Sequence, residues 1–172
     1  IPGTTWSGND SDFFWSTNYW TLGAALDKLF WVTNFSGPGG DPIRYTDGNT
    51  WFDFGASSIT GTGLIRTGPD IYLNQCLALL PFRSRLVAFN TWEGNTLATS
   101  LQFPQRIRWA AIGNPLDVGS VGPPIVPGAW RDDFRGKGGF LDIPTSENIV
   151  AVGYVRDNLV IYCERSTWQL RY

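Results

Sequence analysis

The sequence contains no histidine and no methionine, and only two of its 172 residues are cysteine. Without histidine the chain has no Ser-His-Asp or Cys-His catalytic arrangement and no histidine-bearing metal site. Two cysteines do not make a disulfide framework. We therefore predict that the protein is not an enzyme, that it holds no cofactor or metal, and that Cys76 and Cys163 are buried free thiols.

Paired carboxylates are the remaining candidates for acid–base chemistry. Asp10 with Asp12, and Asp132 with Asp133, have the residue types of a glycosidase acid and base. Both pairs lie in glycine-bearing segments, where aspartates usually form turns or solvated charges. A glycoside-processing enzyme is therefore the weakest of the functional hypotheses.

Long apolar runs and an excess of one charge are also missing. No apolar stretch approaches the roughly 18 residues that a membrane-spanning helix needs, so we expect no membrane-spanning segment. The 13 basic and 15 acidic residues give a net charge of −2. This balance does not predict nucleic-acid binding from the total charge.

The composition favours an all-β fold. No stretch of about a dozen residues keeps a helical apolar period free of glycine, proline or clustered aromatics. The chain has 20 glycines, 11 prolines and nine tryptophans, so turns are frequent and aromatic residues plentiful. The segment from Gly113 to Gly128 reads as a long exposed loop, and residues up to Gly138 are the part of the chain where we expect function.

A repeated pattern organises the chain. Three triplets of aliphatic residue, arginine and aromatic residue recur at nearly equal spacing, and an ungapped hairpin pattern precedes each one at residues 19–29, 76–86 and 149–159. Each hairpin has two short apolar runs around a polar pair, as in a two-residue turn. The expected turn pairs are Asp27-Lys28, Ser84-Arg85 and Asp157-Asn158. The triplets are Ile43-Arg44-Tyr45, Ile107-Arg108-Trp109 and Leu170-Arg171-Tyr172.

Each repeat is thus predicted to be a three-stranded antiparallel meander, with boundaries near 13–56, 70–117 and 139–172. Both alternating faces of these strands are apolar, so each small sheet must be packed between two others. Blades of a β-propeller meet that demand. Because a propeller closes with about four to eight blades, we expect residues 1–172 to form part of a larger propeller and of a longer chain. Residues 63–65 and 139–143 are candidates for additional outer strands.

Two groups of side chains stand out within this frame. We predict that Arg44, Arg108 and Arg171, which share one position of the repeat, pack blades together. Trp92 and Trp130, with Trp6 and Trp15, are candidates for contact with a glycan or a partner because they lie in loop-like contexts. A carbohydrate-binding, lectin-like propeller module is therefore the alternative function.

Two motifs resemble those of known propeller families. Residues 46–51 (Thr-Asp-Gly-Asn-Thr-Trp) resemble the Asp-box of sialidase propellers, a structural turn remote from the active site, although the spacer between aspartate and glycine is missing. Residues 105–117, in which a strand ending in Arg-Trp runs into a Gly-Asn-Pro turn, resemble a segment of propeller-bearing tail proteins of short-tailed bacteriophages. Segments 85–90, 139–144 and 148–152 strengthen that likeness, whereas Ala110 stands where a serine is expected.

The resemblance is to the tail nozzle, or tail tubular protein B, and to the DNA-stabilising tail hub proteins. It implies a virion structural protein located in the phage tail. It also implies a homo-oligomer, a hexamer where the ring is sixfold, that contacts other tail or portal-adjacent proteins. DNA would pass through the channel of that ring without sequence-specific binding.

Overall fold

The computed structural model describes residues 5–8, 10, 12–21, 28–120 and 123–171. Half of the described residues lie in strands, every strand pairing is antiparallel, and the only helical element among them is a 3-10 turn, η1 (Gly55–Ser57). The predicted all-β, antiparallel fold is confirmed. No helix in the described part of the chain is long and apolar enough to cross a membrane.

The first sheet is a four-stranded meander in chain order. A tight turn joins its last two strands, and there the Asp47 carboxylate accepts hydrogen bonds from the backbone N–H groups of Asn49 and Thr50 at 2.9 and 3.1 Å. Gly48 supplies the positive φ of 99° that this turn requires. The strands are β1 (Phe14–Trp20), β2 (Lys28–Asn34), β3 (Arg44–Thr46) and β4 (Trp51–Asp53).

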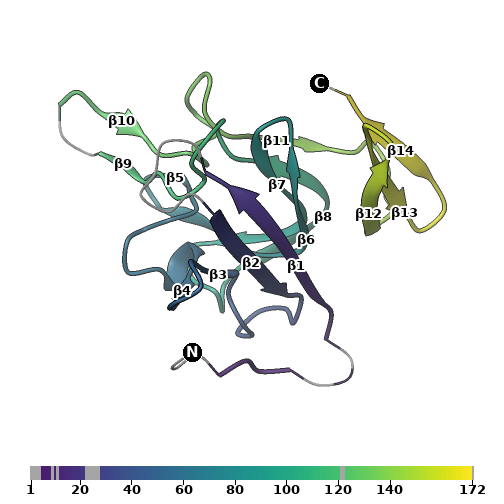
Figure 1. The fold of residues 1–172 in the computed structure, drawn as a ribbon, viewed down its shortest axis with the longest axis horizontal. Helices are drawn as coiled ribbons and strands as arrows, with labels where there is room; N and C mark the ends of the chain where they lie inside the picture. Colours follow the sequence, from purple (N-terminus) through teal and green to yellow (C-terminus); the bar gives the residue numbers. More distant parts are fainter. Residues whose placement is uncertain (1–4, 9, 11, 22–27, 121–122, 172) are drawn as a thin grey trace.

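The second sheet has five strands in the order β11-β8-β7-β6-β5 and forms the centre of the molecule (Figure 1). Its long hairpin β6–β7 carries near-continuous buried residues, as expected for strands covered on both faces. The two segments predicted as additional strands are both present, one at each edge of this sheet. The strands are β5 (Leu64–Arg66), β6 (Ile71–Phe82), β7 (Arg85–Gly94), β8 (Leu101–Trp109) and β11 (Gly139–Asp142).

The third sheet is the three-stranded meander β12-β13-β14, which stands beside the central sheet at the C-terminal end of the described chain (Figure 1). Between β8 and β11 in the sequence, part of the predicted long loop forms a separate two-stranded ribbon, β9 with β10. The strands are β12 (Ile149–Val155), β13 (Asn158–Cys163), β14 (Thr167–Leu170), β9 (Gly119–Ser120) and β10 (Val126–Pro127).

The predicted hairpin turns were displaced by one residue. Phe82 pairs with Arg85 and Val155 pairs with Asn158, so the turn residues are Arg83-Ser84 and Arg156-Asp157. Apolar patterning predicts where the strands lie, but it does not determine which two polar residues form the turn. The predicted turn pairs were therefore shifted by one residue.

The first predicted hairpin was wrong in a different way. The strand that pairs with β2 is Phe14–Trp20, with Trp20 opposite Lys28, and not the expected segment 20–25. The predicted pair Asp27-Lys28 and most of the expected strand 20–25 fall on residues 22–27, which lie outside the described residues, apart from the backbone of Lys28 in β2.

Two hydrophobic cores cover the two faces of the central sheet. The first lies between the central sheet and the first sheet and includes Trp31, Phe54, Leu79 and Trp130. The second lies between the central sheet and the third sheet and includes Phe89, Ile107, Val152 and Ile161. The expectation that a sheet is packed between two others thus holds for the central sheet.

The outward faces of the first and third sheets carry exposed apolar side chains among polar ones. On the first sheet Trp20 is 65% exposed, and Phe14 and Phe30 are also exposed. On the third sheet Val155 is 51% exposed, and Tyr162, which pairs with Ala151 nearer the other end of the hairpin, is also exposed. The stack therefore presents hydrophobic sheet surface at both of its ends.

Candidate functional site

The strongest polar interaction of the central sheet joins Arg108 on β8 to Glu93 on β7. The guanidinium Nε donates to Glu93 Oε1 at 2.8 Å, and Nη2 donates to Oε2 at 2.9 Å. The hydroxyl of Thr91 also donates to Oε1, at 2.7 Å. Arg108 is only 1% exposed, and such a bidentate geometry is what makes a buried arginine–carboxylate pair tolerable.

This pair belongs to a longer chain of alternating charges. Arg106 donates to Glu93 at 3.1 Å and to both oxygens of Asp142 at 2.8 and 2.7 Å. Arg108 also donates to Asp132 at 3.1 Å, and Arg66 donates to the same carboxylate at 2.7 Å. The hydrogen bond from Arg106 lowers the pKa of the Asp142 carboxyl. The network is neutral overall and ties β5, β7, β8, β11 and the loop that precedes β11 together.

Arg44 makes a similar set of contacts within the first sheet. Its Nε donates to Asp53 at 2.8 Å on the neighbouring strand, and its Nη1 donates to Asp41 at 3.4 Å. The guanidinium carbon lies 4.4 Å from the centre of the Trp6 ring. Arg44 therefore fastens the N-terminal segment and a loop to its own sheet.

The three repeat arginines do not occupy equivalent positions. Arg44 lies opposite Val32, and Arg108 lies opposite Ala88. When the repeats are aligned on Leu29 and Leu86, Val32 and Ala88 are one position apart, so the two arginines do not pair at the same point of the hairpin. Arg171 lies just beyond β14, is exposed, and donates to the Gln169 side chain at 3.1 Å. The equal spacing in sequence did not predict this difference because the loops before each strand have different lengths.

Other side chains form the hydrogen bonds between sheets. Trp15 and Thr33 of the first sheet donate to the backbone carbonyls of Leu79 and Cys76 on β6, each at 2.7 Å. Asn90 of β7 donates to the carbonyl of Ile149 on β12 at 3.0 Å. Asn90 has a positive φ of 52°, which asparagine tolerates better than most residues. Sequence reasoning did not single out Thr33 or Asn90, because one polar residue in an apolar strand carries no motif.

The tryptophans proposed for glycan contact lie mostly in packed positions. Trp130 is 1% exposed, donates to the carbonyl of Pro115 at 2.8 Å, and packs edge-on against Phe54. Trp130 lies in a turn outside the strands, as its loop-like sequence context suggested, but its ring has no free face for a sugar. Trp92 is half-buried within β7, and Trp15 is a β1 residue.

The structure also shows the surroundings of the two cysteines and of the Asp132–Asp133 pair. Cys76 and Cys163 are both buried and free, as predicted, and burial raises the pKa of each thiol. Asp132 is held by two arginines, and the hydrogen bond from Arg131 lowers the pKa of Asp133. No group of three or more cysteine and acidic side chains in the described part of the chain could hold a metal ion.

The loop between Gly113 and Gly138 is anchored at its base. Ala111 N–H donates to the carbonyl of Ala129, and Ala129 N–H donates to the carbonyl of Asp117, both at 2.7 Å. These bonds hold the Trp130 ring in the first core. The β9–β10 ribbon projects from this base away from the third sheet (Figure 1).

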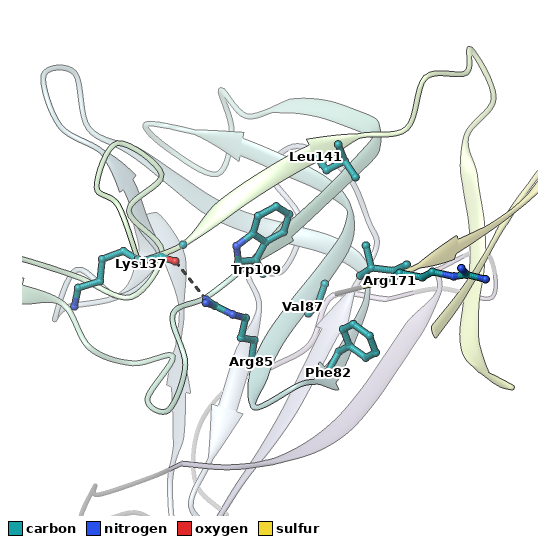
Figure 2. A pocket seen from close by; sticks show the side chains of 10 residues that line it. Phe82, Arg85, Val87, Trp109, Lys137, Leu141 and Arg171 are labelled. Atoms are coloured by element: carbon teal, nitrogen blue, oxygen red, sulfur yellow. Dashed lines mark hydrogen bonds between the residues drawn. The ribbon is translucent and has the colours of Figure 1, made fainter. Parts of the chain in front are cut away.

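A hollow of about 400 Å³ opens where the central sheet, the end of this loop and β14 meet. Trp109, Val87 and Phe82 lie between Arg85 and Arg171 in Figure 2. Arg85 donates to the backbone carbonyls of Ala110 and Lys137 at 2.7 and 3.3 Å. The lining residues are Phe82, Arg85, Val87, Trp109, Gly136, Lys137, Gly138, Leu141, Leu170 and Arg171, so every charged side chain among them is basic.

The position of Trp109 in this hollow is fixed by two glycines. A Cβ atom on Gly139 would lie 2.7 Å from the indole Cζ2, and one on Gly138 would lie 2.9 Å from the Trp109 carbonyl oxygen. Both positions therefore need glycine for the close approach of β11 and β8. The hollow can accept a group with apolar surface and negative charge.

Comparison with known proteins adds no family, since neither a protein-family model nor a curated protein matches this chain.

Proposed function

We propose that this chain is a structural component of a bacteriophage tail, of the nozzle or hub type, that contributes β-propeller blades to an oligomeric ring. The resemblance of residues 105–117 and their flanking segments suggests the tail as its setting. The arrangement of the strands is compatible with blades, because three antiparallel sheets follow one another in chain order and pack face to face.

The observation that carries the proposal is the apolar surface at both ends of the stack. Trp20 and Phe30 on the first sheet, and Val155 and Tyr162 on the third, are exposed on these two sheets. Monomeric proteins rarely leave large contiguous apolar patches in water. Further sheets of the same kind, covering these two faces, would complete the stack as neighbouring blades do in a propeller.

The charge distribution within the sheets supports a passive structural role. Arg44 of the first sheet and Arg66, Arg106 and Arg108 of the central sheet are paired with carboxylates. Tight DNA binding requires basic side chains that neutralise phosphates and displace the counterions condensed on the DNA. A ring built from such internally neutral sheets would let DNA pass without holding it.

The proposal is tested on the complete protein by native mass spectrometry and by electron microscopy of negatively stained particles. We expect a homo-oligomeric ring, of sixfold symmetry if the likeness to the tail nozzle holds, in which both apolar faces are covered. A protein that stays monomeric at micromolar concentration, with these faces accessible to a hydrophobic dye, would contradict it.

A further inference from the structure

Two arginines occupy the same unusual position in two successive hairpins. Arg83 begins the turn between β6 and β7, and Arg156 begins the turn between β12 and β13. Their φ angles are +50° and +56°. Turns of this length favour asparagine, aspartate or glycine at a positive φ, because a longer side chain is sterically disfavoured there. The turns alone do not explain these two arginines.

The same two arginines line a trough that extends from the hollow of Figure 2. A second hollow adjoins the first, because both are lined by Phe82, Leu170 and Arg171. A third hollow adjoins the second, because both are lined by Phe82, Arg83 and Asp157. The second and third hollows each have a volume of about 360 Å³. We call this continuous feature the basic trough; it lies along the junction of the central and third sheets.

The charges of the basic trough are almost all of one sign. Its charged lining residues are Arg83, Arg85, Lys137, Arg156 and Arg171, with Asp157 as the single acid. Elsewhere in the described structure most arginines are matched by carboxylates, but Arg83, Arg156 and Arg171 form no ion pair with any described residue. All three are exposed. This concentration of positive charge occurs in a chain whose net charge is −2.

The floor of the trough has a different character. Trp109, Val87, Leu141 and Leu170 line the first hollow together. Towards the two hairpin turns the lining becomes polar, with Asn158, Gln169 and the arginines. An elongated ligand that places an apolar group at one end and anionic groups along the rest would match this order.

We propose that the basic trough binds an acidic peptide segment of a partner protein, with an aromatic or aliphatic side chain over Trp109 and carboxylates on Arg83, Arg156 and Arg171. Arginine is suited to this because its planar guanidinium can bind a carboxylate through two parallel hydrogen bonds. A nucleic acid fits less well, since its evenly spaced phosphates would meet Asp157, whereas a peptide can place a neutral or basic residue there.

The test uses the complete protein and a fluorescein-labelled decapeptide that alternates glutamate with phenylalanine and leucine, followed by fluorescence anisotropy. The control peptide carries glutamine in place of every glutamate. We expect the acidic peptide to bind, each of Arg83→Asn, Arg156→Asn and Arg171→Gln to weaken it by about tenfold, and added salt to weaken it further. Arg165→Gln, which removes one exposed arginine outside the trough, should leave the affinity unchanged.

A second readout separates binding from folding. Asparagine accepts a positive φ more readily than arginine, so Arg83→Asn and Arg156→Asn should raise the melting temperature by about 1 to 3 °C while peptide binding weakens. Equal binding of both peptides, or unchanged affinity in the asparagine variants, would overturn the proposal. Tighter binding of a DNA duplex, lost in the same variants, would overturn the assignment of a peptide.

Discussion

Arg108 holds both carboxylate oxygens of Glu93 from the adjacent strand, at 2.8 and 2.9 Å, and almost no part of either side chain reaches solvent. The pair spans β7 and β8 next to the register shift between Phe89 and Thr91. Because a buried carboxylate is costly without its partner, this pair makes one alignment of the two strands much more favourable than its neighbours.

Removing the guanidinium of Arg108 should destabilise the protein strongly. In Arg108→Met, Glu93 keeps Arg106 and Thr91 but loses its bidentate partner, and Asp132 loses one of two cations. We expect a loss of about 3 to 5 kcal/mol in the free energy of unfolding, measured by urea denaturation. Arg171→Met, at an exposed position, should change it by less than about 0.5 kcal/mol. Similar losses in both variants would be incompatible with a special role for the Glu93 pair.

Trp130 should act on stability and not on ligand binding. Its ring fills the core between the first and central sheets beside Phe54, so Trp130→Ala should cost about 3 to 5 kcal/mol by leaving a cavity. The half-exposed Trp168, replaced in the same way, serves as the matched control and should cost much less. Folded, fully stable Trp130→Ala protein that had lost binding to a glycan array would instead favour the carbohydrate-binding alternative.

Much of the architecture followed from apolar patterning. Short two-sided apolar runs such as Leu86–Phe89 predicted buried strands, and they lie in the central sheet between two cores. Three meanders were expected and three are present. The strand at 139–142 was assigned to the third repeat but pairs with β8 of the central sheet. An edge strand such as β8 presents unpaired backbone N–H and C=O groups, and these can pair with a strand from another part of the chain.

The side-chain roles were harder to predict. Arg44, Arg108 and Arg171 look alike in sequence, yet two are buried in ion pairs and one is exposed. Their partners, such as Asp53, Glu93 and Asp132, come from loops and strands whose position depends on the tertiary fold. Likewise, nothing local indicates that Trp130 is buried whereas Trp168 is partly exposed.

Both thiols should be unreactive in the native protein. Cys76 and Cys163 are buried, and burial raises the pKa of each, so little thiolate forms near neutral pH. We expect slow labelling by a disulfide reagent at pH 8 and rapid labelling of two thiols per chain in denaturant. Rapid labelling of either thiol in native protein would show that its strand opens to solvent.

Acid should weaken the central sheet through Asp142, and the loop before β11 through Asp133. Hydrogen bonds from Arg106 and Arg131 lower the pKa of these two carboxyls below the ordinary value of 3.8. Their stabilising effect is fully present above pH 3.8 and is lost as the pH falls through the lowered pKa values. Asp142→Asn should therefore reduce the decline of the melting temperature in this acid range. An unchanged acid profile in this variant would show that the ion pair with Arg106 contributes nothing.

DNA should pass such a protein without being bound tightly. Because Arg44, Arg66, Arg106 and Arg108 are paired with carboxylates, we expect weak duplex binding that is not sequence-specific, measured by gel shift at physiological salt. Tight, salt-sensitive binding that depends on Arg106 or Arg108 would contradict the proposed passive channel.

The assembly state of the complete protein tests the central proposal most directly. Electron microscopy of the purified protein should reveal a homo-oligomeric ring in which the faces bearing Trp20 and Phe30, and Val155 and Tyr162, are covered by neighbouring sheets. A stable monomer in which both faces remain exposed to solvent would contradict the account.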